Sequence, residues 1–561
     1  MKKWKKPLLV AASLMLVLTA VLAGCSSGSK GGNNQPGNTA TDKPSDAPKG
    51  TEKPAEDDKW VLGEKPLTFS LYAHYKNSDF PQWESRPLGK WLKEERQVTV
   101  NVISAAGDHT AKLNTLITSN QLPDIIWGDK YDPDIERLRE NGMLVSFDEY
   151  LDKYTNLRDW MGDLNMLRSD DGKLYMFPNW YTGRPAGNAG YVINKKIYEE
   201  LGSPTLETTD DLYEYLKKVR DKYGKEIVPF EPHRAQDAQG LGVLYTAFGE
   251  GASYTHLSKG LRAVPQGDKL TSIFTDPVFR EAEKYIAKLF REKLISQDAF
   301  TQTEDMVKEK VMNGKVAVFA GASPTTFAGE AQEVLTKNDP NAGYFMIWPI
   351  HKPGLDKNKI YPGTYTTLGW NAAYITKNAK DPEALFAFLD WMTGPEGMNV
   401  QFFGPEGGNW EGFDANGQPN FTANYNAEEV KKIQSENDAI MLVGNTGYID
   451  PSKMKYILSV PEEQQDWRAR YQYKITWPTQ QNATEFIGLN PQPDSELGII
   501  KQSIDDLFLE VYANVTSAKS DEEVDKILDK AEADAQKLGY GKLLEYRTEL
   551  WQANKAKLAG K

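Results

Sequence analysis

The chain has 561 residues and a formal charge of −13 at pH 7, with 66 lysine and arginine residues against 79 aspartate and glutamate residues. An acidic chain repels phosphate backbones and anionic headgroups, so nucleic acid and anionic lipid surfaces are poor partners for it. Single hydrophobic cores rarely serve more than about 250 to 300 residues. The length therefore predicts two lobes or domains.

The N-terminal residues have the pattern of a secretory signal. Four lysines occur within "MKKWKK", and an apolar run of about 16 residues extends from Leu8 to Ala23. A membrane-spanning helix needs about 20 apolar residues, so this run is short for a permanent anchor and typical of a signal peptide. Its removal leaves 62 basic against 79 acidic residues, a formal charge of −17.

The only cysteine directly follows this apolar run. The sequence "LAGC", residues 22–25, resembles the lipobox of bacterial lipoproteins, in which the cysteine is acylated and the chain is cut before it. The resemblance implies a signal peptide over residues 1–24 and a palmitate-type lipid on Cys25. Residues 25–58 contain almost no apolar side chain, which predicts a lipidated, disordered tether. A free thiol or an intermolecular disulfide is the alternative for this cysteine.

The body begins with patterns typical of a βαβ unit. Apolar residues alternate in "LTFSLYA" from Leu67 and in "VTVNVIS" from Val98, with a helix-like stretch around Trp91 between them. A third apolar run, "DIIW" from Asp124, ends where loop residues begin. These runs predict strands of one sheet.

Helices with clear start and stop signals follow. In "TTDDLYEYLKKV", Thr208 and Asp211 have capping-box spacing. A second helix begins with Asp381 as its cap and a proline in its first turn, and it stops at the Gly-Pro pair of residues 394–395. Another helix is entered from Ser520. The chain is thus predicted to be a mixed α/β protein with a helical C-terminal third.

Four further segments follow one another in a characteristic order. They are "LPDIIWGDKY" from Leu122, "DGKLYMFPNWYTGR" from Asp171, "EKVMNGKVAVFAGAS" from Glu309 and "GWNAAYITKNAKDPEALFAFLDWMTGPEG" from Gly369. In this order they resemble the extracellular solute-binding proteins of bacterial carbohydrate ABC importers, particularly the long lipoprotein type of Gram-positive bacteria. Each segment is weakly specific, and their order along most of the chain carries the resemblance.

The resemblance implies a two-lobed α/β fold of the periplasmic-binding-protein type II, each lobe with a mixed sheet flanked by helices. Lobe 1 would comprise residues 60–180 and 360–425, and lobe 2 would comprise residues 181–355 and 426–561. The ligand would bind between the lobes, which would close around it by a hinge motion. A membrane permease would then recognise the closed form.

Sugars present C–H faces and rims of hydroxyl groups, so a sugar site combines flat aromatic rings with side chains that hydrogen-bond in pairs. Loops that follow predicted strands or crossovers supply this combination. The expected ligand contacts are Trp127, Asp129 and Tyr131, then Trp180, Tyr181 and Arg184, then Ser323, and then Trp370 and Asn371. Core packing is the alternative for the tryptophans, and a turn cap is the alternative for Ser323.

Two more loops complete the expected site. The resemblance adds His74, Tyr75 and Asn77, because the loop after the first strand often faces the cleft in this family. Trp410 lies in the glycine-rich segment "GGNW", where ligand contact and packing against a helix are both open.

An anchored glycoside hydrolase acting on polysaccharide is the alternative function, and a passive adhesin is a third. A hydrolase would need two carboxylates that flank the scissile bond, and no pair among the acidic residues is distinguished. Five scattered histidines without an HExxH motif, and no cysteine ligand set, argue against catalytic zinc. "DANGQPN" from Asp414 has only the opening of a calcium loop and is predicted to be a turn. We therefore expect no enzymatic activity, no cofactor and no metal.

The sequence as a whole predicts a monomeric carrier on the outer face of the cell membrane, attached there only by its lipid. The carrier would capture a carbohydrate, expected to be an oligosaccharide, and hand it to the permease subunits of an ABC transporter. The identity of the sugar does not follow from the fold, because a few cleft residues decide it.

Overall fold

The structure is a computed structural model that describes residues 59–75, 80–105, 107–180, 188–232 and 235–560. The chain divides into two units, residues 1–58 and 59–561, and every element below belongs to the second unit. The predicted signal peptide, Cys25 and the tether lie outside the described residues. Within the described ranges, no helix combines the length and the apolar character that crossing a bilayer requires.

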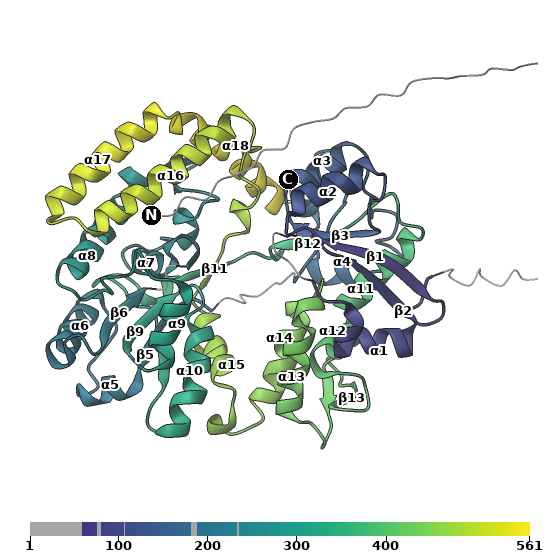
Figure 1. Ribbon diagram of the computed structural model, residues 1–561, viewed down its shortest axis with the longest axis horizontal. Helices are drawn as coiled ribbons and strands as arrows, with labels where there is room; N and C mark the ends of the chain where they lie inside the picture. The colour runs from purple at the N-terminus through teal and green to yellow at the C-terminus, as the bar shows by residue number, and fades with distance from the viewer. Residues whose placement is uncertain (1–58, 76–79, 106, 181–187, 233–234, 561) are drawn as a thin grey trace, which may run out of the picture. The chain divides into compact units, whose positions relative to one another are not determined.

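The first sheet has the strand order β2-β1-β3-β12-β4. Strand β1 pairs in parallel with β2 and β3, whereas β12 lies antiparallel between β3 and β4 (Figure 1). Its strands are β1 (Leu67–Ala73), β2 (Val98–Ile103), β3 (Ile125–Asp129), β4 (Phe177–Pro178) and β12 (Asn371–Ile375). Helix α1 (Pro87–Arg96) connects β1 to β2, which confirms the predicted βαβ unit.

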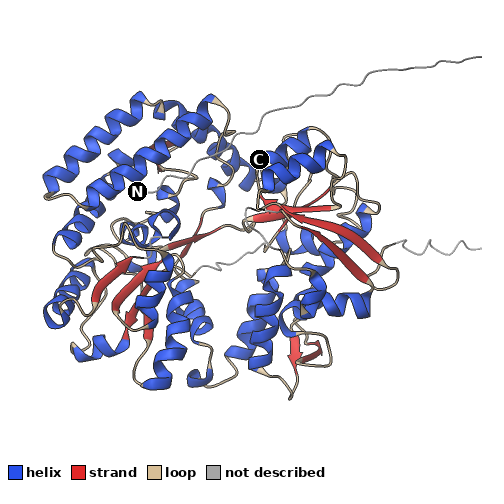
Figure 2. Ribbon diagram, viewed as in Figure 1, coloured by secondary structure: helices blue, strands red, loops and turns tan. Residues whose placement is uncertain are grey.

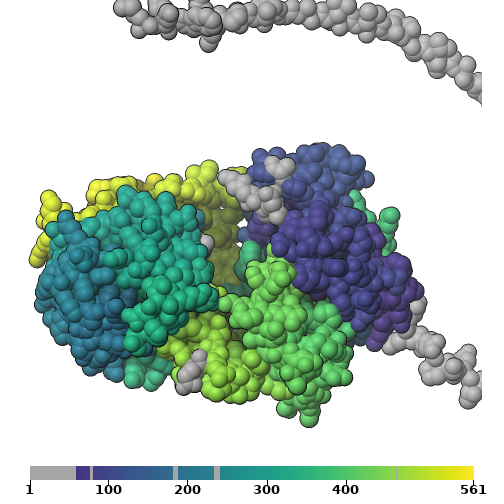
Figure 3. Space-filling model, turned by 60° about the horizontal axis from the view of Figure 1, so that its bottom comes forward, coloured from purple at the N-terminus to yellow at the C-terminus, as the bar shows by residue number. Residues whose placement is uncertain are grey.

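The first core includes a segment beyond residue 425, the predicted end of the first lobe. Ile440, Leu442 and Ile449 are fully buried in it, so residues 430–449 belong with the first sheet and not beyond a boundary at 425. In the space-filling view, the purple early segment and the green later segment adjoin on one surface (Figure 3). The helices around this core are α2 (His109–Thr118), α3 (Pro133–Glu140), α4 (Asn156–Met161), α11 (Pro382–Thr393), α12 (Pro395–Phe403), α13 (Ala427–Asn437) and α14 (Thr446–Ile457).

The second sheet has the strand order β10-β5-β9-β6. Strand β9 is antiparallel to β5 and parallel to β6, and β10 is antiparallel to β5. Its strands are β5 (Gly190–Asn194), β6 (Val228–Pro232), β9 (Val316–Gly321) and β10 (Tyr344–Ile347). The helices that accompany the second sheet and come from the middle of the chain are α5 (Lys195–Glu200), α6 (Thr209–Tyr223), α7 (Ala235–Thr246), α8 (Pro277–Arg291), α9 (Glu304–Met312) and α10 (Pro324–Asn338).

The C-terminal helices pack mainly on the second sheet's side. Phe508, Leu528 and Trp551 are buried in the same core as strands β5 and β6. Helices flank both sheets, and the last quarter of the chain is mainly helical (Figure 2). The C-terminal helices are α15 (Trp467–Tyr471), α16 (Glu496–Thr516), α17 (Asp521–Lys537) and α18 (Tyr540–Leu558), and the short strands are β7 (Ala263–Gln266), β8 (Lys269–Ser272), β11 (Gly363–Tyr365), β13 (Trp410–Phe413), β14 (Pro419–Phe421) and β15 (Gln480–Asn482).

The chain passes between the two sheets more than once. It leaves the first sheet after β4, builds all four strands of the second, and returns to the first as β12. Two sheets on separate cores, each mixed in strand direction and flanked by helices, make a two-lobed α/β fold of the type that the sequence predicted.

The predicted helix signals are present in the structure. Thr208 and Asp211 form a reciprocal capping box at the start of α6. The side chain of Asp381 accepts a hydrogen bond from the backbone of Ala384 at the start of α11, and Ser520 caps α17 in the same way. These local rules hold because the cap satisfies backbone N–H groups that the first helical turn leaves without partners.

The segment that begins at Asp414 is a turn between β13 and β14, as predicted. One carboxylate oxygen of Asp414 accepts hydrogen bonds from the backbone of Asn416 and Gln418. The other oxygen lies 2.8 Å from the ammonium nitrogen of Lys455, which also donates to the carbonyl of Pro419. A lysine ammonium group therefore neutralises this carboxylate.

Candidate ligand-binding site

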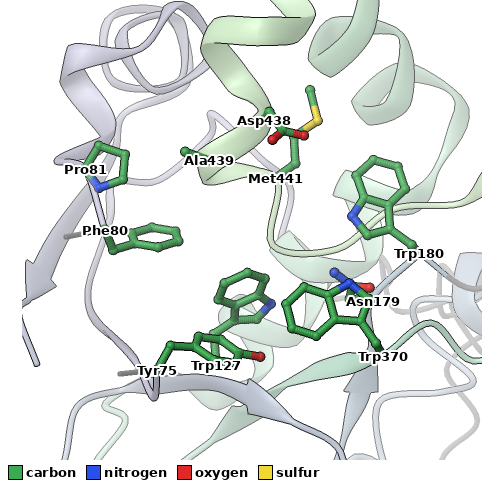
Figure 4. Close-up of a pocket in the computed structure, with 10 residues that line it drawn as sticks. All are labelled: Tyr75, Phe80, Pro81, Trp127, Asn179, Trp180, Trp370, Asp438, Ala439 and Met441. Carbon is green, nitrogen blue, oxygen red and sulfur yellow. The ribbon is translucent and has the colours of Figure 1, made fainter. Parts of the chain in front are cut away.

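A cavity of about 390 Å³ opens on the first lobe, within the size range of small-ligand sites. It lies where the carboxyl ends of the parallel strands β1, β3 and β4 meet the amino end of β12, which runs the opposite way. Ten residues line it, and Figure 4 shows them around an open space: Tyr75, Phe80, Pro81, Trp127, Asn179, Trp180, Trp370, Asp438, Ala439 and Met441.

Aromatic rings form one wall of this cavity. The ring centres of Tyr75 and Trp127 are 5.3 Å apart, and the ring of Trp370 lies 5.6 Å from the first and 6.0 Å from the second. Phe80 extends the cluster at 5.7 Å from Trp127. The side of Trp370 is open, since this residue is 60% exposed. An exposed indole supported by other rings is a flat apolar platform at the mouth of a pocket.

Hydrogen bonds hold two of these rings in position. The indole N–H of Trp127 donates to the carbonyl of Leu442 at 3.0 Å, which ties β3 to the segment before α14. The ammonium group of Lys130 donates to the carbonyls of Leu368 and Gly369, in the turn that carries Trp370. Burial lowers the pKa of Lys130 to about 7. Lys130, which does not line the cavity, thus fixes the turn that carries Trp370.

Trp180 sits at one end of the cavity in an unusual backbone conformation. Its φ angle is +38°, a value that residues other than glycine seldom adopt. Residues with such strained backbone angles cluster at functional sites. Its ring packs edge-to-face on Phe402, with ring centres 5.7 Å apart. A Cβ atom on Gly444 would lie 2.3 Å from the indole, so only glycine fits beside it.

Amide and carboxylate groups supply the polar part of the site. Asn179 is 1% exposed, and its side-chain oxygen has no hydrogen bond within the described residues. Asp438 presents an exposed carboxylate on the wall opposite the rings (Figure 4). Amide and carboxylate oxygens accept hydrogen bonds in pairs, as the neighbouring hydroxyl groups of a sugar require.

A hydrogen bond orients the ring of Tyr75. Its hydroxyl donates to a carboxylate oxygen of Asp129 at 2.9 Å. Burial, with the nearby charge of Asp129, raises the pKa of Tyr75 above its ordinary value, and burial also raises the pKa of Asp129. The amide of Asn371 lies next to the same hydroxyl and is fully buried, with no well-formed hydrogen bond among the described residues. Asp129 and Asn371 therefore act on the cavity through Tyr75.

A second cavity of about 300 Å³ adjoins the first, since Trp180 and Asp438 line both. Its polar groups include Lys453, whose ammonium nitrogen lies 4.3 Å from the ring centre of Phe402 and 3.4 Å from a carboxylate oxygen of Asp450. The remaining lining residues are Thr446, Met454, Ile457, Ala469, Gln472 and Trp477.

The structure brings four of the expected contacts together and places others elsewhere. Tyr75, Trp127, Trp180 and Trp370 share the first cavity. The hydroxyl of Tyr131 donates to the carbonyl of Met166 instead, outside both cavities. Two further expected contacts also lie outside both cavities: Ser323, exposed just before α10, and Asn371, buried behind Tyr75. Three lie outside the described residues: Asn77, Tyr181 and Arg184.

Two expected contacts are corrected by the structure. Trp410 is fully buried in the first core, where its indole N–H donates to the carbonyl of Gly404 at 2.8 Å. His74 is 3% exposed and does not line the cavity, because it directs its ring toward Asp132 and Asp134. Successive residues of an extended chain point to opposite sides, so only one of His74 and Tyr75 could face the ligand.

Six lining residues were not predicted. Asn179 begins the "NWYTGR" motif and carried a usable signal, because its amide stands directly before Trp180. The others are Phe80, Pro81, Asp438, Ala439 and Met441. The last three come from a segment far away in the sequence and have no local pattern that marks a site.

Known proteins resemble this chain in sequence. The family model described as bacterial extracellular solute-binding protein matches residues 77–399. The melibiose/raffinose/stachyose-binding protein MelE of Bacillus subtilis (strain 168) is 24% identical over 307 residues, which are 53% of this chain and 64% of that relative. The match thus spans less than two thirds of the relative's own length.

Solved structures share the fold. The alginate-binding protein AlgQ2, in a structure without calcium ion, superposes with a TM-score of 0.64 at 18% identity, covering 89% of this chain and all of the other. The Streptococcus pneumoniae substrate-binding protein FusA, in complex with kestose, gives a TM-score of 0.61 at 18% identity, with coverages of 87% and 99%.

Proposed function

Because the chain belongs to the bacterial extracellular solute-binding proteins, we propose that it captures an oligosaccharide and delivers it to the permease of an ABC transporter. The observation that carries this proposal is the aromatic cavity of the first lobe. Five of its ten lining residues are aromatic, the amide of Asn179 lies among them, and the carboxylate of Asp438 stands across from the rings. Rings bind the C–H faces of a sugar while oxygen acceptors bind its hydroxyl groups.

The two adjoining cavities favour an oligosaccharide over a single sugar. Trp180 and Asp438 line both, so a chain of sugar rings could run from one cavity into the other. The second cavity includes residues from the segment 469–477 together with residues from α14. The name of the Bacillus subtilis relative, which lists melibiose, raffinose and stachyose, supports the same ligand class.

The anchor and the delivery step complete the proposal. Cys25 would carry lipid at the outer face of the cell membrane, and residues 26–58 would tether the body to it. Ligand between the lobes would favour a closed form, and the permease would bind that form. The protein would act as a monomer and perform no chemistry on the sugar.

A ligand screen tests the binding function. Tryptophan fluorescence and melting temperature would be measured with melibiose, raffinose, stachyose and longer plant and bacterial oligosaccharides, and the sugar would then be recovered and sized by chromatography. We expect a saturable fluorescence change and a higher melting temperature with at least one sugar, which is recovered intact. Shortened sugar would favour the hydrolase, and the absence of any response across the panel would contradict the proposal.

The anchor has its own test. The wild-type chain and the Cys25→Ser variant would be expressed in a Gram-positive host that is fed a fatty acid carrying a clickable tag. We expect label only on the wild type, and release of the variant into the medium. Equal membrane retention and no label on either chain would remove the lipid from the proposal.

A further inference from the structure

His74 has a buried imidazole that the sugar cavity does not use. Its side chain is fully shielded from solvent, and neither ring nitrogen makes a well-formed hydrogen bond within the described residues. Buried polar atoms nearly always have partners, because leaving one without a partner costs free energy. The ring is directed at the carboxylates of Asp132 and Asp134, at the start of α3.

The spacing of these three groups is that of metal ligands. The Nε2 atom of His74 lies 3.6 Å from Oδ1 of Asp132 and 3.5 Å from Oδ2 of Asp134, and the three donor atoms lie within 4.8 Å of one another. Bond lengths of about 2.0 to 2.2 Å in a tetrahedral zinc site place neighbouring donors about 3.3 to 3.6 Å apart. The two separations from the imidazole match this range and are long for hydrogen bonds.

Each carboxylate is held by a further group. Oδ1 of Asp132 accepts a hydrogen bond from the backbone of Asp134 at 2.9 Å, and Oδ2 of Asp134 accepts one from the hydroxyl of Thr110 at 3.1 Å. The other oxygen of Asp134 lies 3.1 Å from the guanidinium of Arg137. Such outer contacts orient the ligands of metal sites in proteins.

An ion could enter this site from solvent. The Asp132 and Asp134 side chains are 23% and 19% exposed, so their oxygens lie between the buried imidazole and the surface. The ring of His109, at the start of α2, lies 4.7 Å from that of His74, centre to centre. A second imidazole thus lies beside that of His74, although its nitrogens are outside the cluster of donor atoms.

We propose that His74, Asp132 and Asp134 bind a first-row divalent cation, with Zn²⁺ as the best match to one imidazole and two carboxylates. Water would complete the coordination. The ion would connect the end of β1 to the start of α3, one residue away from Tyr75 in the sugar cavity. This cation site is separate from the sugar cavity, and cation binding there does not depend on which sugar the protein binds.

The test uses the secreted protein purified without a polyhistidine tag and stripped with EDTA. ZnCl₂ is titrated by calorimetry, the bound metal is counted by mass spectrometry, and the melting temperature is recorded with and without zinc. We expect one zinc ion per chain and a higher melting temperature with zinc. CaCl₂ titrated in parallel should bind far more weakly, because calcium prefers six to eight oxygen ligands.

Conservative variants locate the ion. Asp132→Asn and Asp134→Asn keep the shape of each side chain, and asparagine caps a helix as well as aspartate, so the fold should be retained. We expect each to weaken zinc binding by about tenfold or more. Asp108→Asn is the matched control: Asp108 caps α2 by accepting from the backbone of Ala111 at 2.9 Å and is outside the triad.

Two results would overturn the proposal. One is a stripped wild-type protein that takes up no zinc and shows no thermal shift at millimolar ZnCl₂. The other is zinc binding at wild-type strength in both Asp132→Asn and Asp134→Asn, since the ion would then sit elsewhere. His74→Gln, checked for folding by circular dichroism, should lose the ion in the same way as the carboxylate variants.

Discussion

Asn179 in the aromatic cavity of the first lobe and Glu231 in the interior of the second lobe are both buried polar residues, but their hydrogen bonding differs. In the cavity, Asn179 is almost fully buried and its side-chain oxygen has no hydrogen bond within the described residues. In the second lobe, Glu231 is fully buried, yet its carboxylate accepts from the amide of Gln302 and from the ammonium group of Lys310 at 3.1 Å. A free acceptor beside exposed rings suits a ligand, whereas a satisfied carboxylate suits stability.

This contrast separates residues that serve binding from residues that serve folding. Changes at the paired groups of the second lobe should alter the free energy of unfolding and leave sugar affinity unchanged. Changes at the exposed rings should do the reverse.

The largest effect is expected from Lys310→Met. The change removes the cation beside Glu231 and leaves a buried carboxylate without its charged partner, which should lower the free energy of unfolding by about 3 kcal/mol. Urea unfolding would measure it. Lys308→Met is the control on the same helix, because Lys308 pairs with Glu330 at 2.7 Å in a partly exposed ion pair worth about 0 to 1 kcal/mol. Equal losses in both variants would contradict the prediction.

A similar effect is expected from acid at His256. This residue is 5% exposed, and burial lowers its pKa from 6.5 to about 4. Between these two pH values the unfolded chain binds a proton that the folded chain refuses, so stability falls as the pH drops. The loss from this group should reach about 3 kcal/mol, from the 1.36 kcal/mol that each pKa unit represents.

The measurement is the difference between wild type and His256→Asn in urea unfolding at pH 7, 5.5 and 4. Asparagine can still accept the hydrogen bonds that Ser253 and Tyr245 direct at the imidazole, and it does not titrate. We expect the wild type to lose more stability than the variant as the pH falls. Parallel curves for the two proteins would show that His256 does not carry the acid sensitivity.

The smallest effect on the fold, and a specific one on binding, is expected from Trp370→Ala. Loss of the exposed indole should weaken sugar binding by about 1 to 3 kcal/mol, as for aromatic residues at the centre of other interfaces. Stability should change by about 0.5 kcal/mol or less, because Trp370 is 60% exposed. Calorimetry with the best sugar of the screen would measure the affinity.

Trp160→Ala supplies the control for that experiment. Trp160 is 42% exposed on the same lobe and lines neither cavity. Sugar affinity should not change in this variant. An equal loss in both variants would mean that exposed tryptophans act on stability or solubility and not on the site.

Local chemistry made much of the fold predictable from the sequence. Alternation marked β1 and β2, and caps marked the starts of α6, α11 and α17, because these signals depend on residues close together in the chain. The predicted lobe boundary after residue 425 differs from the observed one for the opposite reason, because it depends on residues far apart in the chain. Val430 and Ile440 are ordinary apolar residues, and only packing against a core built from the start of the chain assigns them to the first lobe.

The site was predictable to a similar degree and for the same reason. Trp370 stands directly before β12 next to loop residues, which is a local signal for exposure at the end of a strand, whereas Trp127 lies inside β3, two residues before the strand ends. Trp410 also stands among loop residues, but distant side chains cover it. Asp438 is the opposite case, a residue of the site without a local signal. No neighbouring residue in the sequence indicates that it faces aromatic rings that occur more than 300 positions earlier in the chain.

Gly444 is a position at which a substitution could change the ligand specificity of the protein. A single methyl group there would collide with the indole of Trp180, which lines both cavities, and would force this ring to move. Gly444 lines neither cavity, so an alanine at this position could narrow the range of accepted sugars without altering any group that contacts them. Directed evolution toward a shorter substrate could therefore begin behind the wall of the pocket.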